Sequence, residues 1–144
     1  MSSENHALAG GVSYVKLDLE GEERFQRLRA DLDVRSHGLN LLRLRPGESG
    51  RIHSHHSQEE VYVVLRGTLT LGFEDGEQQL GPYEAARVGP EVRRQLSNRS
   101  DELCVLLATG GSREHDGRDG IAYESWESTE GRAPQDVPLP PTAT

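Results

Sequence analysis

The chain has little cysteine, few aromatic residues and no long apolar run. Its single cysteine among 144 residues, Cys104, excludes an intrachain disulfide and gives no sign of an oxidising compartment. Because Cys104 lies in the apolar run 103–107, we expect a buried and inert thiol. No apolar stretch is long enough to cross a membrane, and residues 1–6 lack the basic and apolar segments of a signal peptide. We therefore expect a cytoplasmic protein with no membrane partner.

Positive charge is also scarce. The 16 Lys and Arg residues face 24 Asp and Glu residues, which gives a formal net charge of −8. Sequence-independent binding of nucleic acid needs a positive face that releases counterions, so we expect no nucleic-acid partner. The length fits one domain, but only 33% of the residues are hydrophobic, so part of the chain must be solvated rather than packed.

Composition divides the chain into three parts: an N-terminal arm (1–37), a barrel (38–110) and an extended tail (111–144). In the arm, residues 13–19 alternate like a strand, and residues 22–30 contain enough helix formers to predict a short helix. The tail is charged and then rich in proline, so it cannot form a core of its own. We expect Ile121, Tyr123 and Trp126 to pack against the barrel or a neighbouring subunit and so to hold the tail in place.

The central part consists of short runs with period-two patterning, separated by turn signals. Residues 68–73 alternate cleanly, and Asp75-Gly76 supplies the tight hairpin turn that follows them. Many short strands with frequent turns predict an all-β sandwich or barrel, of which a double-sheet jelly roll is one form. No internal repeat is visible, which favours one barrel rather than two.

Two histidines and a glutamate carry the chemistry. His53 and His55 are two residues apart, so in a strand both imidazoles point to one face, with Cα atoms about 6.6 Å apart. After a turn over 56–59, Glu60 opens the next strand beside the first, where its carboxylate can meet the same ion. Two imidazoles and one carboxylate leave coordination positions open, which suits catalytic Fe, Mn or Zn.

This stretch resembles the first motif of the cupin family: glycine, five residues, His-x-His, three or four residues, glutamate, six residues, glycine. Gly47, His53, His55, Glu60 and Gly67 fill every position of the motif. The resemblance implies a double-stranded β-helix or jelly-roll barrel with its metal site inside, near the open mouth. It also implies a homodimer.

The second cupin motif departs from the family pattern. Asn98 and the residues 95–97 before it match, but Arg94 stands where the family has its fourth protein ligand, a histidine. Arginine has no acceptor nitrogen and stays protonated, so it cannot be a ligand. Three arrangements follow. Arg94 swings away and leaves a three-ligand site, it holds an anionic substrate beside the metal, or it pairs with Glu60 and replaces the metal.

Further residues are candidates for the cavity. Tyr62 shares the parity of Glu60, and Arg51 shares that of His53, so both are expected, with Arg94, to bind a small and anionic molecule. If the chain is an enzyme, the resemblance implies a metal-dependent dioxygenase-like or isomerase-like cupin. The alternative is a non-catalytic binding or sensing cupin in which Arg94 pairs with Glu60 and no metal is bound.

Overall fold

The computed structural model describes residues 5–8, 11–112 and 118–143. Within these ranges the chain forms twelve β-strands, one short α-helix and one 3-10 turn, which confirms the predicted all-β class. In the part of the chain that the structure describes, no helix is long and apolar enough to cross a membrane.

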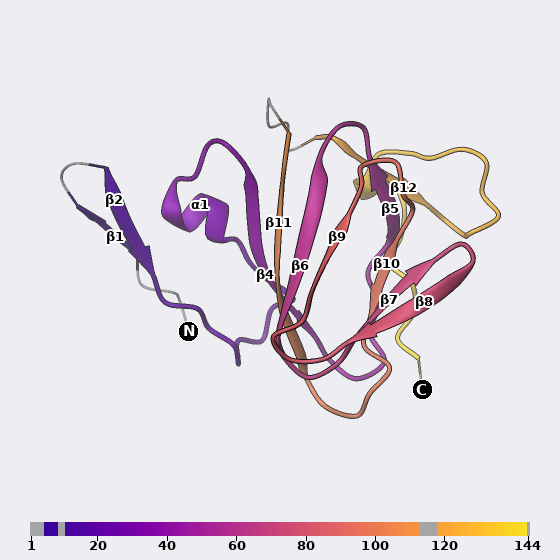
Figure 1. The fold of residues 1–144 in the computed structure, drawn as a ribbon, viewed down its shortest axis with the longest axis horizontal. Helices are drawn as coiled ribbons and strands as arrows, with labels where there is room; N and C mark the ends of the chain where they lie inside the picture. The colour runs from indigo at the N-terminus through magenta and orange to yellow at the C-terminus, as the bar shows by residue number, and fades with distance from the viewer. Residues whose placement is uncertain (1–4, 9–10, 113–117, 144) are drawn as a thin grey trace.

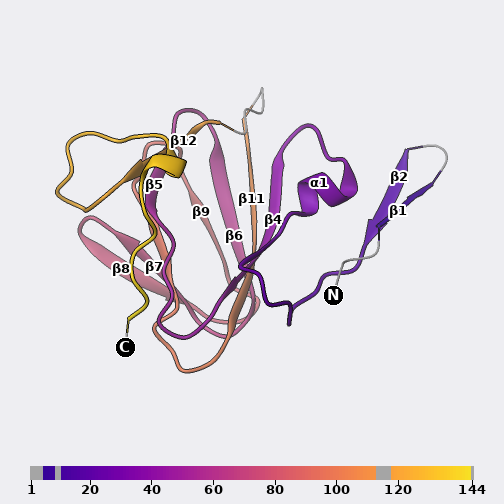
Figure 2. The same ribbon diagram turned by 180° about the vertical axis from the view of Figure 1, so that it is seen from behind.

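Strands β3 to β12 form two facing layers (Figures 1 and 2). One layer is a five-stranded antiparallel sheet. Its strands, in spatial order, are β3 (Phe25–Gln26), β4 (Gly38–Leu44), β11 (Cys104–Gly111), β6 (Glu59–Arg66) and β9 (Ala85–Val88). The central strand, β11, pairs Leu107 with Leu41 of β4 on one side and with Val63 of β6 on the other.

The facing layer consists of two smaller antiparallel sheets. They are β12 (Gly120–Tyr123) with β5 (Ile52–His55), and β10 (Gln95–Ser97) with β7 (Leu69–Phe73) and β8 (Gly76–Leu80). Isolated bridges between His53 and Arg94 and between Ser49 and Ser97 join the two sheets. The two layers make the double-stranded β-helix that the resemblance implies, so this prediction is confirmed.

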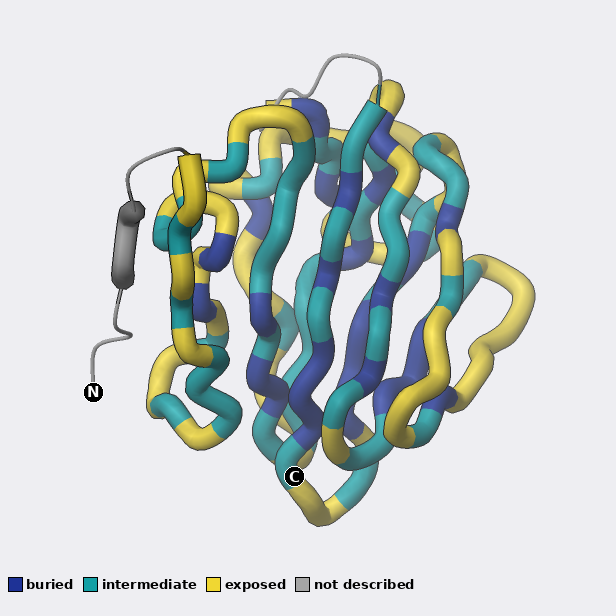
Figure 3. The backbone as a smooth tube through the Cα atoms, turned by 60° about the vertical axis from the view of Figure 1, so that its left-hand side comes forward, coloured by how far each residue is buried: buried dark blue, intermediate teal, exposed yellow. Residues whose placement is uncertain are grey.

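The main core lies between the layers and takes alternate residues along strands, as in the middle of β6. Tyr62, Val64 and Leu106 of the five-stranded sheet meet Leu71 and Leu96 of the facing layer, and all five are at most 4% exposed. Buried positions therefore alternate with more exposed ones along the strands (Figure 3). Burial of this apolar surface is the main force that holds the layers together.

The N-terminal arm covers part of the outer face of the five-stranded sheet. Leu28 of helix α1 (Leu28–Leu32) packs on Leu41 and Val105, and all three side chains are at most 2% exposed. A hairpin of β1 (Asn5–Leu8) and β2 (Val12–Val15) lies beyond the helix, at the edge of the molecule (Figure 1). The arm is thus attached to the barrel through Leu28, through the pairing of β3 with β4 and through the hydrogen bonds of Arg43 to the Asp18 and Glu23 carbonyls.

The predicted helix over 22–30 and the predicted strand over 13–19 are both wrong in extent. Phe25 and Gln26 form strand β3 against β4, and the helix begins only at Leu28. The Gln26 side chain explains this, because its amide accepts from the Asp18 N–H and donates to the Lys16 carbonyl. These tertiary hydrogen bonds outweigh the local helix propensity.

The tail returns along the outside of the β5 layer (Figure 2). Its strand β12 pairs with β5, so that Ala122 lies opposite His53. Beyond the 3-10 turn η1 (Pro134–Asp136), the Ala143 N–H donates to the Gly47 carbonyl at 2.9 Å. The strand that carries the two histidines therefore lies between β12 on one side and Arg94 on the other.

Candidate metal centre and its cavity

The candidate metal ligands come from opposite layers. His53 and His55 lie two residues apart on β5, and Glu60 lies on β6. The expectation that the strand of Glu60 lies beside that of the histidines is wrong, because β5 pairs with β12 and β6 pairs with β9 and β11. The carboxylate instead reaches the imidazoles across the interior of the barrel.

The three side chains converge all the same. Glu60 Oε1 is 3.3 Å from His53 Nε2 and 3.2 Å from His55 Nε2, and one ligand atom from each residue lies within 4.8 Å of the others. Two atoms bound at right angles to one ion, each about 2.1 Å from it, would be about 3 Å apart. The three ligand atoms therefore fit a facial set around a single divalent ion.

Both imidazoles face acceptors through both of their nitrogens. His53 Nδ1 is 3.2 Å from the Arg51 carbonyl, and its Nε2 faces the Glu60 carboxylate. A neutral imidazole has one N–H, so if Nδ1–H binds the carbonyl, the Nε2 lone pair points at a carboxylate. That arrangement needs a cation between them, either a proton or a metal ion.

His55 repeats this arrangement. Its Nδ1 lies 3.6 Å from Asp119 Oδ2 and its Nε2 faces Glu60, yet neither buried nitrogen makes a hydrogen bond among the described residues. Two buried and unsatisfied nitrogens are unusual in a folded protein. Nδ1 of a metal-bound histidine commonly faces a carboxylate in this way. The donor set of this structure therefore fits a metal ion.

Asp119 is a neighbour of the site that the sequence does not reveal. Its carboxylate accepts the backbone N–H groups of Ser57 and Gln58, at 3.0 and 2.9 Å, and so holds the loop between β5 and β6. Burial alone would raise the pKa of Asp119, but these N–H donors and the nearby His55 lower it below its usual range. Asp119 lies in the tail, far along the chain, and no spacing pattern connects it to the histidines.

Arg94 pairs directly with Glu60. The side chain is fully buried, and its Nη2 donates to Glu60 Oε1 at 2.9 Å. Its Nη1 donates to the Val92 carbonyl at 2.7 Å and to two further carbonyls of the same loop. Of the three expected arrangements, the structure has the ion pair. Arg94 is not among the residues that line the cavity described below, and its expected role in binding an anionic substrate stays a prediction.

Tyr62 lies between these two charged groups. Its hydroxyl donates to Glu60 Oε1 and accepts from Arg94 Nε at 3.2 Å, and the residue is only 1% exposed. Burial, with the charge of Glu60, raises the pKa of Tyr62 well above its usual value, so the phenol keeps its proton. Tyr62 therefore holds the Glu60 carboxylate through a hydrogen bond, and it is not among the residues that line the cavity described below.

Four polar groups thus lie within 3.3 Å of Glu60 Oε1: two imidazoles, the phenol and the guanidinium. Burial by itself would raise the pKa of Glu60, but the adjacent imidazoles of His53 and His55 hold it well below the usual range. Glu60 is therefore a permanent anion at the centre of the site.

Arg51 lies elsewhere. Its Nε donates to the Val137 carbonyl of the tail at 2.8 Å, and its side chain lines a groove beside Tyr123 and Trp126. Strand β5 begins only at Ile52, so the parity argument that linked Arg51 to His53 does not hold. In the structure Arg51 thus contacts the tail, and its expected role in substrate binding stays a prediction.

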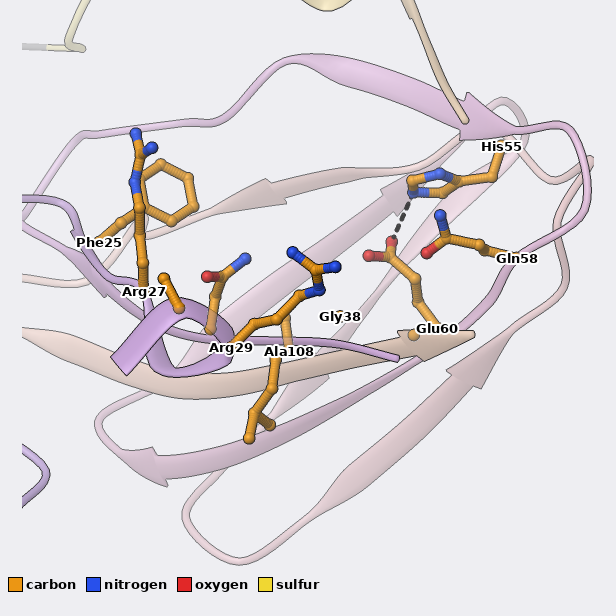
Figure 4. Close-up of a pocket in the computed structure, with 12 residues that line it drawn as sticks. Phe25, Arg27, Arg29, Gly38, His55, Gln58, Glu60 and Ala108 are labelled. Atoms are coloured by element: carbon orange, nitrogen blue, oxygen red, sulfur yellow. Dashed lines mark ion pairs between the residues drawn. The ribbon is translucent and has the colours of Figure 1, made fainter. Parts of the chain in front are cut away.

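A cavity of about 470 Å³ opens beside the cluster. His55, Gln58 and Glu60 line one end, and Arg27 and Arg29 of the arm line the other (Figure 4). The volume suits a small molecule rather than a polymer. No sequence pattern reveals either arginine as a site residue, because only the packing of the arm on the sheet brings them to the barrel mouth.

Comparison with known proteins agrees with the fold. Residues 40–110 match the family model described as Cupin domain. The chain belongs to the cupin superfamily. No curated protein sequence matches this cupin chain significantly.

Solved structures resemble the cupin over most of its length. A putative sugar phosphate isomerase from Acidithiobacillus ferrooxidans is 20% identical over 98% of this chain and 90% of its own, with a TM-score of 0.59. A cupin superfamily sugar phosphate isomerase from Silicibacter pomeroyi is 24% identical over 81% and 79%, with the same TM-score of 0.59. A cupin protein from Bacteroides fragilis is 21% identical over 67% and 82%, again at 0.59. These similarities extend the fold assignment beyond residues 40–110.

Proposed function

We propose that this cupin binds a divalent metal ion, Fe, Mn or Zn, through His53, His55 and Glu60, and that it binds or transforms a small anionic molecule in the adjacent cavity. The observation that carries the proposal is that both imidazoles face acceptors through both nitrogens, which leaves a cation site between them and Glu60. The ion, when bound, would act as a Lewis acid toward an oxygen of the ligand or as an oxygen-activating centre.

Each neighbour of the cluster has a definite part. Asp119 orients His55 by facing its Nδ1, and Tyr62 and Arg94 hold the Glu60 carboxylate in place. Since no fourth protein ligand is present in the second motif, coordination positions stay open toward the cavity. The chain's own groups therefore position the ligand atoms and leave access for a small molecule.

Charge balance favours an anionic ligand. The charges of Glu60 and Arg94 cancel, so a dication bound by neutral imidazoles would add two positive charges to a half-buried site, and the Asp119 carboxylate beside His55 offsets one of them. An anion that enters the cavity would offset the other, and its binding and that of the metal should reinforce each other. Sugar phosphates, which the names of two solved relatives mention, are suitable compounds for a first screen.

The test is a titration of untagged protein with Fe(II), Mn(II) and Zn(II), followed by removal of excess metal and elemental analysis. We expect about one equivalent per chain. The His55→Ala variant should lose most of it, whereas His37→Ala, which changes a half-buried histidine that is not part of the cluster, should not. Binding that is equal in all three proteins would contradict the proposed site.

A second candidate function is favoured by the ion pair itself. Arg94 is fully buried and lies 2.9 Å from Glu60 Oε1, so its guanidinium can take the place of the metal as the cation that pairs with Glu60. The chain would then be a non-catalytic cupin that binds or senses a small molecule. In that case the same titration finds metal well below one equivalent, and the Arg94→His variant gains metal binding that the parent lacks.

The homodimer that the family resemblance implies remains a proposal. Light scattering on the untagged full chain would test it, with the mass of two chains as the expected result.

A further inference from the structure

The cavity beside the cluster has a cationic wall that comes from the N-terminal arm. Arg27 and Arg29 flank Leu28 and line the end of the cavity opposite Glu60 and His55. Figure 4 shows the guanidinium of Arg29 directed across the cavity toward the Glu60 carboxylate, with Arg27 farther out.

Arg27 and Arg29 differ from the other arginines of the arm. Arg24 lies 3.5 Å from Glu48, and Arg35 lies 3.4 Å from Asp33, so each has an acidic partner. Among the described residues, neither Arg27 nor Arg29 makes a side-chain hydrogen bond or ion pair. In a chain with 24 acidic residues and a net charge of −8, the two unpaired arm arginines are thus the two at the cavity.

The backbone that carries these arginines is firmly held. Leu28, between them, is only 2% exposed and packs on Leu41 and Val105 of the five-stranded sheet. Gln26 is 7% exposed and hydrogen-bonds to the backbone on both sides of Leu17. Two long side chains therefore project into the cavity from a fixed position, which lowers the entropic cost of holding a ligand there.

The cavity has a positive balance. Glu60 is the one acidic residue among the residues that line it, and Arg94 pairs with that carboxylate at 2.9 Å from beneath. The two arm guanidiniums are then left without a compensating negative charge in the cavity. Guanidinium binds carboxylate and phosphate groups through parallel N–H donors, so an anion of either kind is the natural complement.

We infer that Arg29, assisted by Arg27, binds the anionic group of the ligand, a phosphate or a carboxylate. The ligand is then a small molecule with an anionic group at one end and the portion that meets His55 and Glu60 at the other. This inference rests on the proposed function for the location of the ligand, but it does not require a bound metal. It also makes the arm a part of the site.

The test is calorimetric titration of the untagged full chain with inorganic phosphate and, separately, with malonate. The better-bound of the two probes identifies the anionic group. The dissociation constant of that probe should rise at least about tenfold in Arg29→Gln and less in Arg27→Gln, since each removes one charged donor set. Arg35→Gln, which removes an arm arginine outside the cavity, should leave it within about twofold.

Two results would overturn the inference: no binding of either anion by the parent at concentrations up to about 10 mM, or equal losses in Arg29→Gln and Arg35→Gln. Far-UV circular dichroism and thermal melts establish that the exposed substitutions leave the fold intact. Metal content measured on the same samples separates the two proposals. Anion binding that Arg29→Gln weakens in a parent without metal supports the cationic wall while it refutes the metal function.

Discussion

Replacement of Arg94 by methionine removes a buried positive charge beside the metal ligands and keeps much of the side-chain volume. In the parent, Nη2 of Arg94 lies 2.9 Å from Glu60 Oε1. A metal ion about 2.1 Å from that oxygen would lie at most about 5 Å from the guanidinium nitrogen. The guanidinium therefore opposes metal binding directly, and it also competes for the carboxylate.

The magnitude follows from Coulomb's law. A dication and a unit charge about 5 Å apart repel by about 7 kcal/mol at an effective dielectric constant near 20. Solvent screens part of this, because the side chains of the three ligands are 13–21% exposed. We therefore expect the variant to bind Zn(II) with a free energy more favourable by at least about 3 kcal/mol, which is about 100-fold in dissociation constant.

Stability changes in the opposite direction without metal. Loss of Arg94 leaves Glu60 without its buried partner and removes the donor to the Val92 carbonyl, which should cost about 3–5 kcal/mol in the free energy of unfolding. Zn(II) should recover much of that loss, because it restores a cation beside Glu60. Apo and metal-loaded melting curves measure this.

Competition with a chelator of known affinity measures the metal dissociation constant. The control is Arg87→Met, which removes an arginine that lies 3.4 Å from Glu59 on the surface and is 61% exposed. Should Arg94→Met bind Zn(II) no more tightly than the parent and Arg87→Met, the electrostatic reasoning is refuted. Arg94→His serves as a second variant if the methionine protein does not fold.

Three further predictions concern the surroundings of the site. The fold lowers the pKa of Asp119, so the ionised carboxylate stabilises the folded state at pH values above the ordinary pKa of an aspartate. Asp119→Asn should therefore lower Tm most near neutral pH, and the difference in Tm from the parent should shrink as the pH falls below about 4. A difference in Tm that does not depend on pH would contradict this. Gly67 has φ +75°, and a Cβ added there would lie 2.3 Å from the Leu103 carbonyl oxygen. Gly67→Ala should therefore lower the free energy of unfolding in urea by at least about 2 kcal/mol. Gly50→Ala, whose Cβ would lie 3.8 Å from the Leu96 carbonyl oxygen, should lower it by less than about 1 kcal/mol. Burial raises the pKa of Cys104 to about 11, so the native thiol should resist alkylation at pH 8 and react only after denaturation; rapid native alkylation would show that it is accessible.

Local periodicity explains the part of the site that the sequence predicts. His53 and His55 share a face because side chains alternate along a strand, and this holds whatever the neighbouring strands are. Gly67 ends its strand with a positive φ and a close backbone approach, which is why the motif requires glycine there. These features depend on the chain within a few residues, so they can be read directly.

Tertiary packing decides the remainder of the site. Glu60 reaches the histidines from the opposite layer. Asp119 of the tail faces His55, and Arg29 of the arm lines the same cavity, although both lie outside residues 40–110. No local sequence pattern predicts these contacts, because they depend on which face of the sheet each segment packs against. The sequence shows that residue 94 is an arginine. It does not show whether the guanidinium faces the cavity or Glu60, because that depends on the loop carbonyls that the guanidinium binds.

The central claim is that His53, His55 and Glu60 form a metal site despite the ion pair with Arg94. A crystal structure of untagged protein grown with Zn(II), with anomalous data collected on both sides of the zinc edge, tests it most directly. The account predicts one zinc peak per chain within bonding distance of both Nε2 atoms and the Glu60 carboxylate. The absence of a zinc peak at the cluster, with Arg94 still bound to Glu60, would contradict this claim. The remaining proposal would then be a non-catalytic cupin that binds a small molecule without metal.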